Sequence, residues 1–391
     1  ALEAGIDFID TAEMYPTHPV KAETVGRTEE IVGSWLARSG RRGDVTIATK
    51  VSGKNGGFVR DGRGLSPETL TEALEGSLRR LGTDAIDLYQ IHWPDRGSYH
   101  FRQNWSYDPT GQDRARVVEN IAEAMEALKG HVAAGKIRAF GLSNETAWGT
   151  MQWLAAARAV DGPRVATQQN EYSLVCRQFD TDHAELSHHE GIVLLAYSPL
   201  AAGLLTGKYQ DGAVPEGSRM SRTPDLGGRR SDRIFGAVAA YHDVARRHGL
   251  DPVQMALAWI RTRPVTSIPI LGATGMDQLD LALGAADLVL SDEVLAEIDG
   301  VHKAWPLPYW DRACAIARLA REHAVDRFRV HPPPWRCSSA GADGACRMRR
   351  TRRAAGGRAA ARPGGAPGLD RRCRLAAPVR RLDRDPLGRR G

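Results

Sequence analysis

Short apolar runs alternate with amphipathic segments along the first 310 residues of this 391-residue chain. The apolar runs are nearly continuous, which is typical of parallel strands buried on both faces. We expect seven strands, at residues 6–10, 45–50, 85–92, 136–144, 164–172, 191–200 and 265–273. The helical period predicts helices between them, at residues 28–40, 66–82, 117–135, 146–160, 180–191 and 251–263. Two of these helices begin with a capping side chain before proline, at Ser66-Pro67 and Asp251-Pro252.

This alternation predicts an α/β fold with a parallel sheet and helical crossovers. A closed (β/α)8 TIM barrel needs eight strands, and the chain begins with ALEAGIDFID, which reads as the end of a helix followed by a strand. We therefore expect a TIM barrel that lacks its first strand because the sequence is truncated at its N-terminus. An open doubly wound sheet would place a G-x-G-x-x-G turn after its first strand, and no such turn follows residues 6–10.

The charge of the chain changes sharply near residue 310. Residues 311–391 contain 21 arginines and 7 acidic residues, which leaves 32 basic and 40 acidic residues in the part before them. Arg, Ala, Gly and Pro dominate this tail, and such a composition cannot bury a core. We expect a barrel domain over residues 1–310 and a disordered basic tail over 311–391. The tail is either an arm that binds nucleic acid or, as we favour, out-of-frame translation; no nucleic acid is expected at the acidic barrel.

Cysteine usage points to a reducing, cytoplasmic setting, because Cys176 is the only cysteine before residue 310. The four tail cysteines lack the spacing of a zinc site, so no metal is expected there. No apolar stretch is long enough to span a bilayer, and no signal peptide is recognisable, so no membrane partner is expected.

Four polar residues lie at or just after the ends of three predicted strands. Asp10 closes the first strand, Tyr15 follows it, Lys50 closes the second, and His92 closes the third. In a (β/α) barrel the carboxyl ends of the strands form the mouth of the active site. An acid, a phenol, an amine and an imidazole together suit proton transfer to a carbonyl oxygen.

Two long loops are expected at the same mouth. Residues 96–114 carry several aromatic side chains, and residues 201–232 are rich in Gly and Arg. Loops of this length are either disordered insertions or functional segments. We interpret the first as a substrate lid and the second as a cofactor clamp.

Seven ordered motifs within residues 1–310 resemble the aldo-keto reductase family. They are DTAEMY, ATKVSG, IDLYQIHWPD, GKIRAFGLSNET, QQNEYSL, AYSPLAAGLLTGKY and ILGATGMDQL. The AEMYP, KVSG and HWP strings resemble the bacterial Tas-type branch in particular. The resemblance implies a (β/α)8 barrel that holds NADPH and reduces small aldehydes or ketones.

By this resemblance, Tyr15 is the general acid that protonates the carbonyl oxygen. A phenol has a free pKa of about 10, and the ammonium group of Lys50 would lower that value by stabilising the phenolate. Asp10 would pair with Lys50 and hold it in position. His92 would orient the carbonyl and share the proton.

The resemblance also implies cofactor contacts. Ser143, Asn144 and Gln169 match residues that hydrogen-bond the carboxamide, and Tyr197 matches the ring that stacks on the nicotinamide. The matching pyrophosphate and adenosine segments contain Ser198, Leu200, Gly203, Lys208, Gly272, Thr274 and Gln278. One departure is Ala282, where the family usually has Asn.

Two other functions stay open. A cofactor-binding regulatory or redox-sensing subunit, like the barrel-shaped β-subunits of potassium channels, would keep the fold and much of the site. A metal-dependent barrel hydrolase is suggested only by the closeness of His92 and Asp95, and the H-x-H pair that would supply further ligands is missing from the strand ends. The sequence predicts neither the substrate nor the oligomeric state.

Overall fold

The computed structural model describes residues 1–17 and 20–310. The predictions made for residues 311–391 lie outside this range. Seven parallel strands form one sheet in sequence order, each hydrogen-bonded to the next. The strands are β1 (Phe8–Asp10), β2 (Thr46–Val51), β3 (Ile86–Ile91), β4 (Ile137–Ser143), β5 (Val165–Glu171), β6 (Val193–Tyr197) and β7 (Ser267–Pro269). All seven strands predicted from the apolar runs are therefore confirmed.

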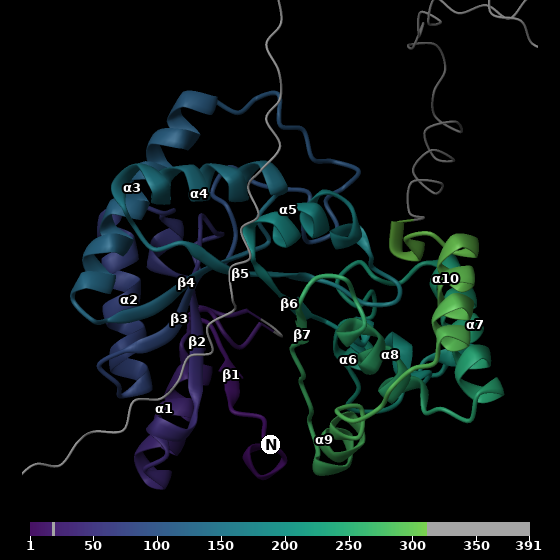
Figure 1. The fold of residues 1–391 in the computed structure, drawn as a ribbon. Coiled ribbons are helices and arrows are strands. Elements are labelled where there is room, and N and C mark those ends of the chain that lie inside the picture. Colours follow the sequence, from purple (N-terminus) through teal and green to yellow (C-terminus); the bar gives the residue numbers. More distant parts are fainter. Residues whose placement is uncertain (18–19, 311–391) are drawn as a thin grey trace, which may run out of the picture. The chain divides into compact units, whose positions relative to one another are not determined.

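The helices cover the sheet in the order that the crossovers require. They are α1 (Arg27–Ser39), α2 (Pro67–Leu81), α3 (Arg114–Ala133), α4 (Ala147–Val160), α5 (Asp182–Glu190), α6 (Arg219–Arg222), α7 (Asp232–Arg247), α8 (Pro252–Arg261), α9 (Met276–Leu283) and α10 (Asp292–Ala304). Figure 1 shows α1 to α4 along one side of the curled sheet, with α7 and α10 side by side beyond β7. The six predicted helices are confirmed, but α6, α7, α9 and α10 were not predicted.

The sheet is a curled half-barrel over the residues that the structure describes. Strand pairing runs from β1 to β7, and these two outer strands are not paired with each other within residues 1–17 and 20–310. The expected barrel lacks one of its eight strands, and a sheet of seven strands without closure is what this part of the chain forms. The parallel order and the placement of all strand carboxyl ends at one edge agree with the prediction.

Capping side chains fix where several helices begin. Ser66 accepts a hydrogen bond from the amide of Thr69, and the side chain of Thr69 accepts one from the amide of Ser66, so the two form a capping box at α2. Asp251 accepts from the amides of Val253 and Gln254 at α8. Both predicted starts are confirmed, and each cap contributes about 1 kcal/mol of helix stability.

Two large apolar clusters hold the fold together. One lies between β2–β5 and helices α1–α4, and includes the fully buried Tyr89 and Phe140. The other joins α7, α8 and α10 to the segment after β5, where the rings of Tyr172 and Trp259 stack with their centroids 5.3 Å apart. Because the sheet is fixed by packing along its length, the polar groups at its carboxyl edge have a rigid support.

Candidate active site

The structure brings together the four polar residues predicted at the strand ends. Asp10 ends β1, Lys50 lies in β2 next to its end, and His92 directly follows β3. Tyr15 lies in the loop after β1. The Nζ atom of Lys50 donates to Oδ2 of Asp10 at 2.7 Å and to the carbonyl oxygen of Thr11 at 2.8 Å. The ring centroid of Tyr15 lies 4.9 Å from Nζ of Lys50 and 5.6 Å from the ring centroid of His92.

Lys50 is completely buried, and the side chain of Asp10 is only 6% exposed. Burial alone would lower the pKa of Lys50, but the nearby Asp10 carboxylate and the Tyr15 hydroxyl outweigh it, so the pKa of Lys50 is raised. Lys50 is therefore a positive charge at neutral pH. Asp10 also accepts from Nε2 of Gln169 at 2.9 Å and from Nε2 of Gln90 at 3.3 Å, so its carboxylate is held from several strands.

The pKa of Tyr15 shifts in the direction opposite to the one expected. Burial raises the pKa of Tyr15, and the opposing effect of the Lys50 charge does not overcome it. Lys50 thus acts in the predicted direction, but desolvation of the phenolate is the larger effect. In this structure Tyr15 carries its proton at neutral pH.

His92 is a neutral imidazole. Burial lowers its pKa well below the usual value, and the charge of Lys50 lowers it further. Its Nδ1 atom is buried and has no hydrogen-bond partner among the described residues. A neutral ring can donate with one nitrogen and accept with the other, which suits contact with a carbonyl or hydroxyl group.

The four residues predicted to contact the nicotinamide end continue this polar network. Nε2 of Gln169 reaches Asp10, and Oγ of Ser143 donates to the carbonyl oxygen of Gln169 at 2.8 Å. Nδ2 of Asn144 donates to the carbonyl oxygen of His92 at 3.0 Å, and the hydroxyl of Tyr197 donates to Oδ1 of Asn144 at 2.8 Å. The ends of β4, β5 and β6 therefore meet the ends of β1 and β3 at one edge.

The segment after β6 has an unusual backbone. Ser198 has a φ of 53°, Ala201 of 53°, Ala202 of 57° and Gly203 of 93°. The φ of Gly203 favours glycine, and a Cβ atom there would lie 2.9 Å from Cε of Lys208, so the Lys208 side chain would have to move. Leu200 is partly buried against the second apolar cluster and anchors the segment. Lys208 is exposed beside these turns, and its ammonium group suits contact with an anion.

The residues predicted at the adenosine end follow β7. The amide and the hydroxyl of Thr274 both donate to Oε1 of Gln278, each at 3.2 Å, across the first turn of α9. Gly272 is exposed, and a Cβ atom there would meet nothing within 4 Å. Open space and the free amides at the start of α9 are compatible with an anionic ligand.

Glu171 is a charged group at this edge that sequence reasoning missed. Glu171 ends β5 and is 9% exposed. Its carboxylate accepts from Nη1 of Arg102 at 2.8 Å and from Nε of Arg229 at 2.7 Å. Burial opposes the negative charge, but the two guanidinium groups outweigh this effect and lower the pKa of Glu171. An acidic residue at the end of a predicted strand was the available signal, as it was for Asp10.

Glu171 joins the two long loops, because Arg102 belongs to residues 96–114 and Arg229 to residues 201–232. The guanidinium group of Arg229 also donates to Oγ of Ser198 at 3.3 Å. A pocket lies beside this pair of loops. Its lining includes Tyr99, Phe101, Arg102, Asn170, Glu171 and Tyr197.

A cluster with ligand spacing suitable for a metal lies elsewhere among the described residues, at His248, Glu293 and Glu297 on the outer helices. Its Glu297 carboxylate is already paired with Arg247. The hydrolase alternative rests on the closeness of Asp95 to His92 in the sequence. In the structure Asp95 accepts hydrogen bonds from the amides of Lys54 and Leu65. The geometry around His92 gives no support to a metal-dependent hydrolase.

Comparison with known proteins agrees with this geometry. The model of the aldo/keto reductase family matches residues 1–303, so the chain belongs to the aldo-keto reductase family. It is 46% identical to "Protein tas" of Escherichia coli (strain K12) over 317 residues, which cover 79% of this chain and 88% of that protein. This similarity supports the Tas-type branch.

More distant relatives carry other names. An "Uncharacterized oxidoreductase YrpG" of Bacillus subtilis (strain 168) is 33% identical over 306 residues, 77% of this chain and 84% of that protein. A "Probable voltage-gated potassium channel subunit beta" of Arabidopsis thaliana is 30% identical over 309 residues, 77% of this chain and 85% of that protein. In the part of the chain that the structure describes, the search for membrane-crossing helices found none of sufficient length and hydropathy.

Proposed function

We propose that this chain reduces aldehydes or ketones to alcohols with NADPH, and that Tyr15 is the general acid. The observation that carries the proposal is the contact set of Lys50, whose Nζ atom pairs with Asp10 and lies 4.9 Å from the centre of the Tyr15 ring. A buried ammonium beside a phenol serves to stabilise the phenolate that remains after the phenol gives up its proton. Membership of an oxidoreductase family supports the same conclusion.

The side chains present fit a nicotinamide dinucleotide. Amide groups at Asn144 and Gln169 suit a carboxamide, and the Tyr197 ring offers an aromatic surface next to them. The exposed ammonium group of Lys208, beside the turns of the segment after β6, suits a diphosphate. NADPH, when bound, supplies the hydride for carbon. The choice of NADPH over NADH rests on the family.

The residues of the chain would then handle the proton. Tyr15 carries its proton at neutral pH because burial raises its pKa, so it can donate to the oxygen of the carbonyl as negative charge develops there. Lys50 stabilises the resulting phenolate, and Asp10 keeps the Lys50 side chain in place at 2.7 Å. His92, being neutral, can hydrogen-bond the same carbonyl oxygen and orient it.

The test is to compare the wild type with the Tyr15→Phe variant. Binding of NADPH would be followed by quenching of tryptophan fluorescence, and turnover by oxidation of NADPH with 4-nitrobenzaldehyde. We expect micromolar binding by both proteins and turnover by the wild type alone. Equal turnover in both would show that Tyr15 is not the acid.

A second candidate is a cofactor-binding subunit with little turnover, because relatives named as potassium channel β-subunits share 30% identity with the chain. Binding of NADPH without turnover in the wild type would favour this function. We also propose a cytoplasmic setting for either function. The single cysteine of the described residues, Cys176, is free and buried, which is compatible with a reducing compartment.

A further inference from the structure

Glu13 is a buried acid that the proposed reaction does not use. It lies between Asp10 and Tyr15 in the chain and is 4% exposed. Its Oε1 atom accepts a hydrogen bond from the amide of Ser52 at 2.5 Å, and its own amide donates to the carbonyl oxygen of Lys50 at 3.2 Å. Glu13 therefore ties the Tyr15 loop to the end of β2, where Lys50 lies.

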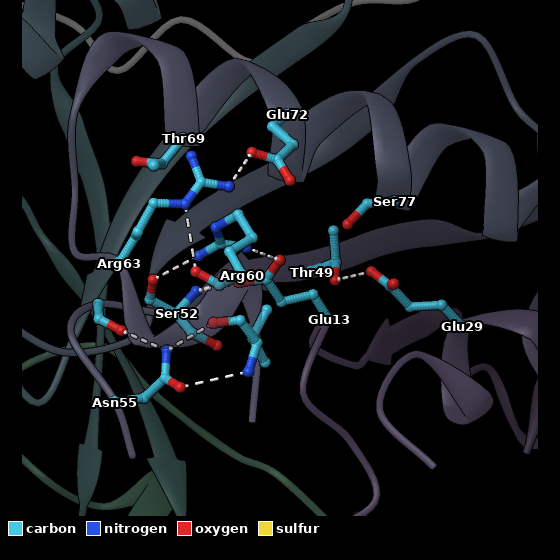
Figure 2. Close-up of polar contacts among 12 residues, drawn as sticks. Glu13, Glu29, Thr49, Ser52, Asn55, Arg60, Arg63, Thr69, Glu72 and Ser77 are labelled. Atoms are coloured by element: carbon cyan, nitrogen blue, oxygen red, sulfur yellow. Dashed lines mark hydrogen bonds and ion pairs between the residues drawn. The ribbon is translucent and has the colours of Figure 1, made fainter. Parts of the chain in front are cut away.

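The partner of this acid is Arg60, from the loop between β2 and α2. The two groups form an ion pair, in which the side chain of Arg60 alone is 5% exposed and that of Glu13 alone 3%. Nη2 of Arg60 also donates to the carbonyl oxygen of Ser52 at 2.8 Å. Figure 2 shows Arg60 reaching Glu13 and Ser52 at the end of the strand. Glu13 thus holds the amide of Ser52, and Arg60 holds its carbonyl oxygen.

Hydrogen bonds of Asn55 fix the conformation of the loop that carries Arg60. Oδ1 of Asn55 accepts from the amides of Gly57 and Val59, and Nδ2 of Asn55 donates to the carbonyl oxygens of Gly53 and Val59. Arg60 has a φ of 45°, a conformation that most side chains avoid and that persists only when its surroundings impose it.

The charge of Glu13 depends on this partner. Burial raises the pKa of Glu13, and Arg60 is the main opposing influence. Removing one partner of a buried ion pair lowers the free energy of unfolding of the protein, because the other charge stays buried without compensation.

We infer that the Glu13–Arg60 pair positions Tyr15 against Lys50, so that Glu13 and Arg60 are positioning residues of the proposed reductase. Glu13 is two residues from Tyr15 in the chain. Ser52, whose amide donates to Glu13, is two residues from Lys50. The pair therefore holds the Tyr15 loop and the end of β2 together at Ser52. Small displacements of a proton donor lower turnover strongly without changing cofactor affinity. The inference rests on the proposed function for its kinetic part only.

The experiment compares Glu13→Gln, Arg60→Gln and the double variant with Arg63→Gln. Arg63 is a matched control, since it lies in the same loop and pairs with Glu72, but both side chains of that pair are 51% exposed. Turnover, KM for the aldehyde and the Kd for NADPH would be measured well below the melting temperature. Hydrogen exchange of residues 10–16 would be followed by mass spectrometry in the absence of any substrate.

We expect kcat to fall about tenfold or more in both single variants, with the Kd for NADPH within about twofold of the wild type. The double variant is expected to lose no more than the single variants, because the two residues act as one unit. Exchange of residues 10–16 should speed up in these variants and stay unchanged in Arg63→Gln.

Two results would overturn the inference. One is a lower melting temperature with unchanged kcat, which would make the pair merely structural. The other is exchange of residues 10–16 that matches the Arg63→Gln control. If the wild type shows no turnover, the proposed function fails, but the exchange comparison still decides whether the pair orders the Tyr15 loop.

Discussion

Lys50 Nζ lies 2.7 Å from Asp10 Oδ2, and neither side chain is more than 6% exposed. Residues 40 positions apart are thereby joined across the edge between β1 and β2. The pair places one positive charge under the ring of Tyr15 and binds the first strand to its neighbour. Its two consequences, for stability and for the reaction, can be separated by measurement.

Asp10→Asn should destabilise the protein by roughly 3–5 kcal/mol, because it leaves the buried Lys50 charge without its partner. The free energy of unfolding would be measured by urea denaturation. Glu72→Gln is the control: it breaks the exposed pair with Arg63 and should cost less than about 1 kcal/mol. Equal effects of the two substitutions would contradict the importance of burial.

Glu171→Gln should loosen both long loops at once. Arg102 and Arg229 both pair with this carboxylate, and a neutral amide would leave their charges without compensation. We expect a loss of about 3 kcal/mol in the free energy of unfolding, and faster proteolysis within residues 96–114 and 201–232. Limited trypsin digestion followed by mass spectrometry would locate the new cleavages. Cleavage confined to one loop would show that Glu171 does not join them.

Stability should fall as the pH is lowered from 6.5. Burial lowers the pKa of His100 to about 4 and that of His183 to about 3, so the unfolded chain binds protons that the folded chain does not. Each histidine then lowers the free energy of unfolding by about 1.4 kcal/mol per pH unit. The loss begins below pH 6.5 and ends near pH 4 for His100 and near pH 3 for His183. His92 changes in the same direction.

Urea denaturation of the wild type and of His183→Gln at pH 6.5, 5.5 and 4.5 would test this dependence. The variant should lose stability less steeply, by about 1.4 kcal/mol per pH unit. Parallel curves for the two proteins would show that His183 does not contribute.

Cys176 should resist alkylation in the folded protein. Burial raises the pKa of its thiol far above the usual value, and the nearby Glu171 charge adds to this effect. Only the thiolate reacts readily. Iodoacetamide labelling followed by peptide mapping should find Cys176 unmodified in buffer and modified in urea. Rapid labelling under native conditions would mean that the segment after β5 opens.

The strand ends were predictable because their signal is local. An apolar run closed by a polar residue, as at Asp10, Lys50 and His92, can be read without knowing which strands are neighbours. Helix α7 is not among the predicted helices, although its burial pattern is amphipathic, because it begins at the end of the Gly- and Arg-rich residues 201–232, which the sequence predicts as a loop. Helices α6, α9 and α10 are likewise not among the predicted helices.

Side-chain partners were much less predictable. Glu171 reads as an ordinary strand end, and its pairing with Arg102 and Arg229 joins residues 69 and 58 positions away. The pKa of Tyr15 was expected to fall because Lys50 is near, but the cost of burial was not visible in the sequence.

The sequence by itself determined the order of strands and helices, the parallel sheet and the set of polar residues at its carboxyl edge, since these depend on local periodicity and chain direction. Only the tertiary structure decided that the buried Glu13 pairs with Arg60 beside the strand that holds Lys50, that Glu171 joins two loops, and that desolvation prevails at Tyr15. These outcomes depend on distances between residues remote in the chain and on the exclusion of water, which packing alone sets.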